Sequence, residues 1–205
     1  MNKDLVNKNL SVSGISKKLF NYRSYTPIPF LILMVIFAKP TVTSLVVGFI
    51  IGLSGEYLRV WGVSWAGSET RTTGGVGGTY LIISGPFAYV RNPLYVGNIL
   101  LYVGIGLMSW ALFPYLQITA LVVFSIQYHF IVLEEERYLI DEFNDYARYC
   151  KQVPRFIPRL TPYKNSSVQQ PPFNLKAGLR SEQRSLQAFA GVALVIVVIW
   201  IFLNS

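Results

Sequence analysis

Long apolar runs separated by short polar or charged stretches dominate the chain. Three runs lack Asp, Glu, Lys and Arg and approach the ~20 residues that a helix needs to cross ~30 Å of hydrocarbon. They are residues 95–113, 115–133 and 186–203. Two shorter apolar runs, residues 25–38 and 41–55, precede them. This pattern predicts an all-α integral membrane protein with about five transmembrane helices.

The polar stretches between these runs divide the chain into segments. Lys39-Pro40 separates the first two runs, which therefore form a helix pair, and only Pro114 separates the next two. A polar, Pro-rich stretch leads to the last run. The expected segments are 1–24 as an N-terminal segment, 25–61 as a transmembrane helix pair, 62–160 as a core with two more spans, 161–184 as a linker and 185–205 as a C-terminal transmembrane helix.

The basic residues indicate how the spans are oriented. Eighteen Lys and Arg stand against ten Asp and Glu, a formal net charge of +8. With five spans and a cytoplasmic N-terminus, all basic residues except Lys39 fall in cytoplasmic segments or at cytoplasmic helix ends. This is the asymmetry of the positive-inside rule. We therefore expect residues 62–91 and 134–184, the largest polar segments, to be cytoplasmic.

The composition excludes several classes of protein. Only 14% of residues are charged and the mean hydropathy is +0.42, so the basic excess fits a membrane surface and not a soluble nucleic-acid binder. One cysteine, Cys150, and one histidine, His129, exclude an internal disulfide and a His- or Cys-rich metal cluster. We expect no nucleic-acid partner and no metal, so carboxylates, arginines, tyrosines, backbone groups or a bound cofactor must carry any chemistry.

Two polar motifs lie at the cytoplasmic ends of the third and fourth spans. Arg91-Asn92-Pro93 opens one span and Glu134-Glu135-Glu136-Arg137 ends the next. Each alone fits an ordinary helix end, with Asn92 as N-cap and Pro93 in the first turn, or with solvated acids. Because a tight hairpin joins them, together they outline a polar pocket facing the cytosol, where free backbone N–H groups suit an anion.

Residues 134–160 have the spacing of an amphipathic helix. Leu139, Phe143, Tyr146 and Tyr149 recur at helical intervals, and Pro154 ends the pattern. We expect this helix and the loops before residue 92 to form the pocket.

Two blocks in this region resemble known enzymes. Gly85-Pro86-Phe87-Ala88-Tyr89-Val90-Arg91-Asn92-Pro93-Leu94-Tyr95-Val96-Gly97 is similar to the G-x-Y-x-x-x-R-H-P-x-Y-x-G block of the isoprenylcysteine carboxyl methyltransferase family. Glu135-Glu136-Arg137-Tyr138-Leu139, followed by Phe143, Tyr146, Tyr149 and Val153-Pro154, resembles that family's second block. The broader group includes phospholipid N-methyltransferases and, more remotely, sterol and steroid reductases.

The resemblance implies an integral membrane methyltransferase that uses S-adenosylmethionine (SAM), enclosed by the two blocks. Arg91 and Glu135 are the expected catalytic residues. The residues that correspond to the family's cofactor contacts are Thr79, Tyr80, Leu81, Ile82, Phe87, Asn92, Pro93, Leu94, Tyr95 and Glu135. The acceptor would be a lipophilic or prenylated small molecule or a membrane lipid, first of all the carboxylate of a prenylcysteine-like substrate.

Three positions depart from the family's pattern. Asn92 replaces a histidine, Asn144 replaces a glycine, and Ile131 stands where the family places an arginine, one turn before the glutamate, that holds the substrate carboxylate. Three alternatives therefore remain open: N-methylation of a phospholipid amine, an NADPH-dependent lipid reductase, and a non-catalytic membrane module.

Overall fold

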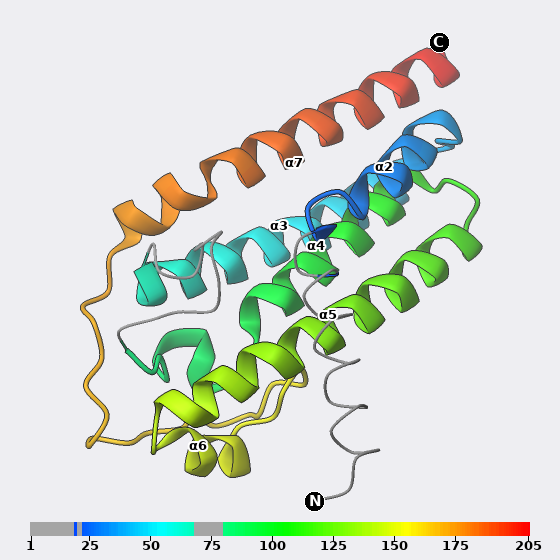
Figure 1. The fold of residues 1–205 in the computed structure, drawn as a ribbon. Coiled ribbons are helices and arrows are strands. Elements are labelled where there is room, and N and C mark those ends of the chain that lie inside the picture. The colour runs from blue at the N-terminus through cyan, green and yellow to red at the C-terminus, as the bar shows by residue number, and fades with distance from the viewer. Residues whose placement is uncertain (1–18, 20–21, 68–79) are drawn as a thin grey trace, which may run out of the picture.

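The fold is all-helical, as the apolar runs predict. A computed structural model of the chain describes residues 19, 22–67 and 80–205, and these contain helices and no strand. The helices, labelled as in Figure 1, are α2 (Pro27–Ile36), α3 (Val42–Ala66), the 3-10 helix η2 (Gly85–Ala88), α4 (Pro93–Ser109), α5 (Tyr115–Glu142), α6 (Tyr146–Gln152) and α7 (Leu175–Asn204).

Three of these helices, α3, α5 and α7, are long and apolar enough to cross a membrane. The other two apolar helices, α2 and α4, have 10 and 17 residues and are shorter than a full span. Many large apolar side chains on the long helices point away from the protein, as lipid contact requires. Examples are Val46, Ile50, Val122, Ile126, Val195 and Phe202. The membrane-protein fold is therefore confirmed.

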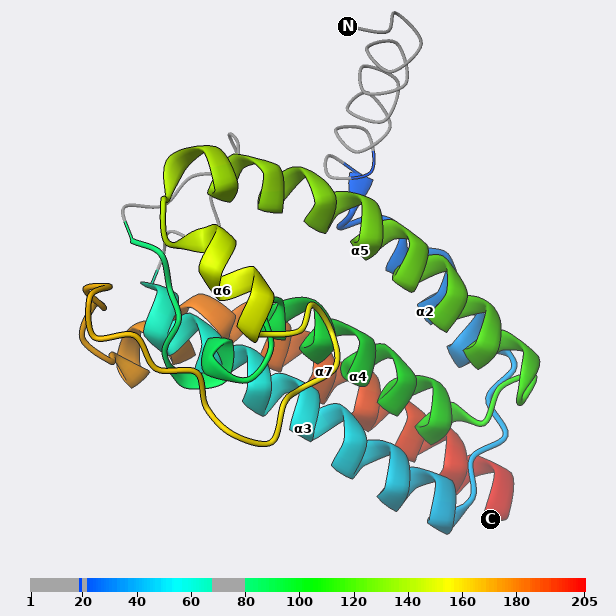
Figure 2. The ribbon, with the colours of Figure 1, turned by 90° about the horizontal axis from the view of Figure 1, so that it is seen from below.

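Helices α3 and α4 lie side by side along most of their length (Figures 1 and 2). Glycines make this close approach possible, because a Cβ atom added to Gly104 of α4 would lie 2.3 Å from the Gly52 nitrogen of α3. A Cβ on Gly48 would lie 2.5 Å from the Gly104 oxygen, and one on Gly55 2.5 Å from the Gly97 oxygen. Small residues at such positions are typical of helix pairs in membranes. This glycine seam fixes α4, and with it the start of α4, against α3.

Polar side chains join α7 to α3. The Arg59 guanidinium donates from Nε to Glu182 Oε2 at 3.1 Å and lies 3.9 Å from Glu56, one turn before it on α3. Ser185 of α7 donates a 2.5 Å hydrogen bond to Glu56 Oε1. Because both carboxylates are almost fully buried, these contacts specify how α7 packs in an otherwise apolar interface.

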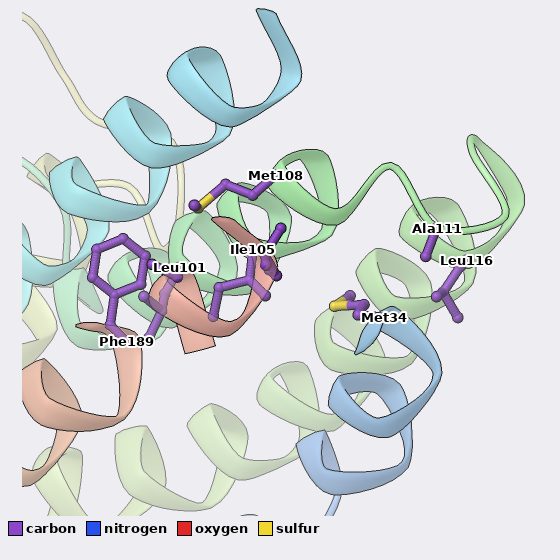
Figure 3. Close-up of a cluster of buried hydrophobic side chains, with 9 residues drawn as sticks. Met34, Leu101, Ile105, Met108, Ala111, Leu116 and Phe189 are labelled. Atoms are coloured by element: carbon purple, nitrogen blue, oxygen red, sulfur yellow. The ribbon is translucent and has the colours of Figure 1, made fainter. Parts of the chain in front are cut away.

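The main apolar core collects side chains from four helices. The cluster groups Met34 of α2 with side chains of α4, α5 and α7 (Figure 3). The buried members are Met34, Leu101, Ile105, Met108, Ala111, Leu116, Phe189, Ala193 and Ile196. The core therefore ties the short helix α2 and the C-terminal helix to the α4–α5 hairpin.

Two segment boundaries differ from the sequence prediction. Helix α5 continues without a break past Leu133 to Glu142, and residues 143–145 separate it from the short helix α6, so residues 134–160 are not one amphipathic helix. Helix α7 begins at Leu175, so the last ten residues of the expected 161–184 linker are helical. Both helices have an apolar part and a charged part, and hydropathy alone detects only the apolar part.

Candidate active site

The two blocks meet at one end of the helix bundle. Figure 1 shows η2, the start of α4, the end of α5 and α6 gathered there. The α4–α5 hairpin accounts for this meeting, because α4 leaves the site and α5 returns to it after the turn at residues 110–114.

Arg91, an expected catalytic residue, faces the carboxylate next to Glu135. Its Nε lies 3.2 Å from Glu136 Oε1, and its Nη1 donates to the Cys150 oxygen at 3.3 Å. Arg155 donates two hydrogen bonds to the same carboxylate, from Nε to Oε1 at 3.1 Å and from Nη2 to Oε2 at 2.5 Å. This hydrogen bonding raises the pKa of the Arg155 guanidinium. A buried carboxylate between two arginines thus binds the start of α4 to the end of α5.

Asn92 occupies the N-cap position of α4, but its side chain does not cap the helix. Its Nδ2 donates to the Arg155 oxygen at 3.2 Å, and the Arg91 backbone nitrogen donates to the Pro154 oxygen at 2.9 Å. Pro93 follows, buried, in the first turn of α4. The N-terminus of α4 is therefore bound to the chain after α6 and not closed by its own side chain.

Glu135 and Tyr95 form a second contact between the blocks. The Tyr95 hydroxyl donates to Glu135 Oε1 at 2.6 Å. The Tyr95 ring lies 4.8 Å, centroid to centroid, from Tyr128 of α5. Leu94 points elsewhere, because a Cβ on Gly62 of α3 would lie 2.8 Å from its Cδ2. Tyr95 and Glu135 therefore face each other, whereas Leu94 packs against α3.

The segment before η2 packs on α6. Leu81 and Ile83 are buried against Tyr146, Tyr149 and Val153. Tyr80 is exposed and Ile82 half-buried, so the expected cofactor contacts alternate between the core and the surface. Thr79 lies outside the residues that the structure describes.

A glutamine from the expected linker holds this segment in place. Gln170 Oε1 accepts hydrogen bonds from the backbone nitrogens of Ile83 at 2.9 Å and Ser84 at 3.1 Å, and its Nε2 donates to the Leu81 oxygen at 2.8 Å. These contacts join residues almost ninety positions apart, so no local sequence signal reveals them.

Phe87 lies in η2, and its backbone is anchored to α6. The Tyr149 hydroxyl donates to the Phe87 oxygen at 2.6 Å. Burial raises the pKa of Tyr149, so the phenol stays protonated and keeps this bond. Tyr149, a member of the second block, therefore holds η2 against α6 and helps to position the site.

A shallow apolar indentation lies between α4 and α5, farther along the hairpin, and its side chains pack closely enough to leave no room for a water molecule. Stacked rings connect it to the polar end, since Tyr102 packs on Phe124 and Phe124 on Tyr128, the neighbour of Tyr95. The lining residues are Ile99, Tyr102, Val103, Gln117, Ala120, Leu121 and Phe124.

Among the described residues, no group of three or more His, Cys, Asp and Glu side chains could hold a metal ion.

Two curated proteins are similar to part of this chain. The cobalt-zinc-cadmium resistance protein CzcN of Cupriavidus metallidurans is 36% identical over 90 residues, which cover 43% of this chain and 40% of that protein. The nickel-cobalt-cadmium resistance protein NccN of Alcaligenes xylosoxydans xylosoxydans is 32% identical over 90 residues, 44% of this chain and 41% of that protein. This chain thus matches about two fifths of the length of these relatives. No solved structure matches.

A family model described as "Phospholipid methyltransferase" matches residues 43–145. The match runs from the second residue of α3 to the residue before α6, and it contains Arg91, Tyr95, Glu135 and Glu136. It spans half of the chain and includes the start of α4 and the end of α5. The chain therefore belongs to the phospholipid methyltransferase family, a family of membrane methyltransferases.

Proposed function

We propose that this protein transfers the methyl group of SAM to a lipophilic acceptor at the polar end of the α4–α5 hairpin. The observation that carries the proposal is the Tyr95–Glu135 hydrogen bond of 2.6 Å, which brings together one residue from each of the two resembling blocks. The family match covers both residues.

The groups at this site have the chemistry that SAM requires. The Leu94 and Tyr95 N–H groups lie in the first turn of α4, where backbone donors have no acceptor within the helix, so they suit the carboxylate of the cofactor. The Glu135 carboxylate can accept from a ribose hydroxyl or the amino group, and the Tyr95 ring offers a face to a cation. The Arg91 guanidinium already binds Glu136 and the Cys150 oxygen, which favours a positioning role beside the catalytic role that the sequence predicts. We infer that it positions the start of α4.

When bound, SAM supplies a methyl group on a positively charged sulfur. The acceptor attacks this carbon in line with the breaking bond to sulfur, so the protein contributes mainly position and exclusion of water. The apolar surface between α4 and α5 could take the acceptor's chain, and the row of packed rings from Tyr102 to Tyr95 extends from this surface toward Glu135.

For the acceptor group we propose the carboxylate of a prenylcysteine-like molecule, which the resemblance implies. An ionised carboxylate attacks without losing a proton and needs no general base. The second candidate is the amine of a phospholipid. The surroundings of Ile131 favour it, because this side chain is 1% exposed among Ala120, Phe124 and Tyr128 and offers no charge for a carboxylate.

The first experiment measures cofactor binding. We expect calorimetric titration of the detergent-purified protein with S-adenosylhomocysteine to show micromolar affinity, and titration with NADPH to show none. Binding of NADPH alone would favour the lipid reductase, and binding of neither would favour the non-catalytic module.

A variant pair localises the cofactor. We expect Glu135→Gln to weaken S-adenosylhomocysteine binding about tenfold or more, because a charge-assisted hydrogen bond contributes about 1.5–3 kcal/mol. Glu134→Gln is the matched control, since Glu134 lies next to it on α5 but pairs at the surface with Arg137 at 3.0 Å. Equal affinities of the two variants would refute the proposed role of Glu135.

A further inference from the structure

The loop after α6 presents two apolar side chains outside the helix bundle. Ile157 is 78% exposed and Leu160 is 98% exposed, the highest value of any large apolar side chain that the structure describes. Neither residue belongs to a helix, so the contact of a transmembrane helix with lipid does not account for them. Figures 1 and 2 show that the chain between α6 and α7 runs along the outside of the bundle. Two exposed apolar side chains only three residues apart thus form a small apolar surface on this loop.

Backbone hydrogen bonds fix the loop to the segment before α4. The Arg159 nitrogen donates to the Tyr89 oxygen at 2.9 Å, and the Tyr163 nitrogen donates to the Ala88 oxygen at 2.8 Å. Pro158 restricts the backbone between the two apolar residues. The loop is therefore held in place on both sides of Leu160, and its apolar side chains are held outward.

A row of aromatic rings relates this loop to the lipid-facing surface of α3. The ring centroid of Tyr89, which binds the loop, lies 6.3 Å from that of Trp61, and the Trp61 centroid lies 6.2 Å from that of Tyr57. Tyr57 is 68% exposed, and Leu53, one turn before it in the apolar part of α3, is also exposed. Tyrosine and tryptophan are enriched where a transmembrane helix meets the membrane surface. The loop therefore lies close to the level at which α3 leaves the hydrocarbon.

The loop and α6 carry positive charge of one sign only. Residues 146–164 contain five basic residues and no acidic one, namely Arg148, Lys151, Arg155, Arg159 and Lys164. Arg155 binds Glu136, whereas the side chains of Arg148, Lys151 and Lys164 are exposed. An apolar surface flanked by exposed cations matches a leaflet of anionic lipids, which attracts basic residues and buries apolar ones.

We propose that Ile157 and Leu160 enter the membrane surface beside the site, and that the exposed basic residues around them bind anionic lipid headgroups. This inference rests on the membrane fold and does not require methyl transfer. The same loop accepts hydrogen bonds from the start of α4, from the Arg91 nitrogen to the Pro154 oxygen and from Asn92 Nδ2 to the Arg155 oxygen. A leaflet that holds this loop therefore also holds the N-terminus of α4.

The test places an environment-sensitive dye at position 160 of the full-length protein in lipid nanodiscs, in which both faces remain accessible. Cys150→Ser provides a cysteine-free background, because Arg91 binds the backbone oxygen of this residue and not its thiol. Leu160→Cys receives the dye, and Asn144→Cys is the matched control. Asn144 is exposed just after α5, whose last residue lies about 12 Å beyond Glu134 along the helix axis. Equal Tm values of the two labelled variants show that both are folded.

Two quenchers distinguish lipid from water. We expect a nitroxide on the acyl chain of a phospholipid, near its headgroup, to quench the dye at position 160 and not the dye at position 144. Iodide should quench the dye at position 160 about tenfold less than the dye at position 144, because burial of a leucine-sized side chain favours the inserted position by at least that factor.

The choice of spin-labelled lipid tests the headgroup. We expect spin-labelled phosphatidylglycerol to quench the dye at position 160 more than spin-labelled phosphatidylcholine does. Lys164→Gln should lower this preference about fivefold, since a basic residue near an anionic surface contributes about 1 kcal/mol. Lys39→Gln is the control, because Lys39 is exposed between α2 and α3 at the opposite end of the bundle, and it should leave the preference unchanged.

Three results would overturn the proposal. Equal access of iodide to positions 160 and 144 overturns the insertion of the loop. Protection of position 160 from iodide without quenching by either lipid overturns it as well, and would mean that a protein surface covers the loop. Equal quenching by the two lipids, unaffected by Lys164→Gln, overturns the role of anionic headgroups. These measurements are independent of S-adenosylhomocysteine binding, so they leave the proposed function to its own test.

Discussion

The glycine seam between α3 and α4 should make Gly104→Ala destabilising, although alanine is the better helix former. The added Cβ would lie 2.3 Å from the Gly52 nitrogen, 2.6 Å from its Cα and 2.7 Å from the Gly48 oxygen. Ordinary contacts begin at 3.4 Å, so the helices must separate by about 1 Å. All three neighbours are backbone atoms, which cannot rotate away.

The matched control is Gly191→Ala on α7, where an added Cβ meets nothing within 4 Å. Both variants gain the same helix propensity of about 1 kcal/mol. Their difference therefore isolates the cost of overpacking, which is typically ~1–3 kcal/mol. We expect the upper part of this range because the contacts are rigid, and hence a Tm about 5–10 °C lower than that of Gly191→Ala.

The single cysteine provides the assay. Cys150 is half-buried in α6, so a thiol-reactive fluorescent dye reports unfolding as detergent-solubilised protein is heated. A Tm for Gly104→Ala equal to or above that of Gly191→Ala would refute the close approach of α3 and α4.

Two further substitutions test the contacts that position the site. Tyr149→Phe removes the donor to the Phe87 oxygen, and we expect a loss of about 1–3 kcal/mol in the free energy of unfolding, measured by denaturant titration; unchanged stability would mean that this bond is absent. Glu136→Gln leaves Arg91 and Arg155 without their shared negative charge. We expect it to lower the free energy of unfolding by about 3 kcal/mol, the low end for a buried ion pair because Arg155 is partly exposed. Arg137→Gln, at the surface, should lower it by less than about 1 kcal/mol in the same titration.

Hydropathy predicts most of the helices because each apolar run has to be buried in lipid or protein. The helix class and the positions of α3, α4 and the membrane half of α5 follow from it directly. Hydropathy does not predict the break at residues 143–145, because the largely charged segment 134–142 keeps helical spacing. It does not predict the start of α7 at Leu175 either, because the first turns of α7 are polar.

The contacts of the site are less predictable than its motifs. The motif spacing brought Tyr95 and Glu135 into one expected pocket, and the structure places them in contact. In the structure Arg91 contacts Glu136 and not Glu135. The motif spacing does not distinguish these two glutamates, because they are neighbours on α5 and differ only in the direction in which their side chains point. Gln170 comes from a segment without any motif, and only the tertiary fold brings it to the site.

Because α5 is one unbroken helix, a change in its tilt within the bilayer also moves Glu135. The 28 residues of α5 measure about 42 Å, which is longer than a ~30 Å hydrocarbon layer, and Glu135 lies in the charged C-terminal part of the helix. A transmembrane helix tilts when the bilayer becomes thinner, and a tilt of about 5° displaces the end of such a rod by about 4 Å. The glycine seam holds α4 to α3, so α4 does not follow this movement of α5. The displacement is larger than the 2.6 Å between the Tyr95 hydroxyl and Glu135 Oε1. We therefore expect bilayer thickness to change the distance between Tyr95 and Glu135.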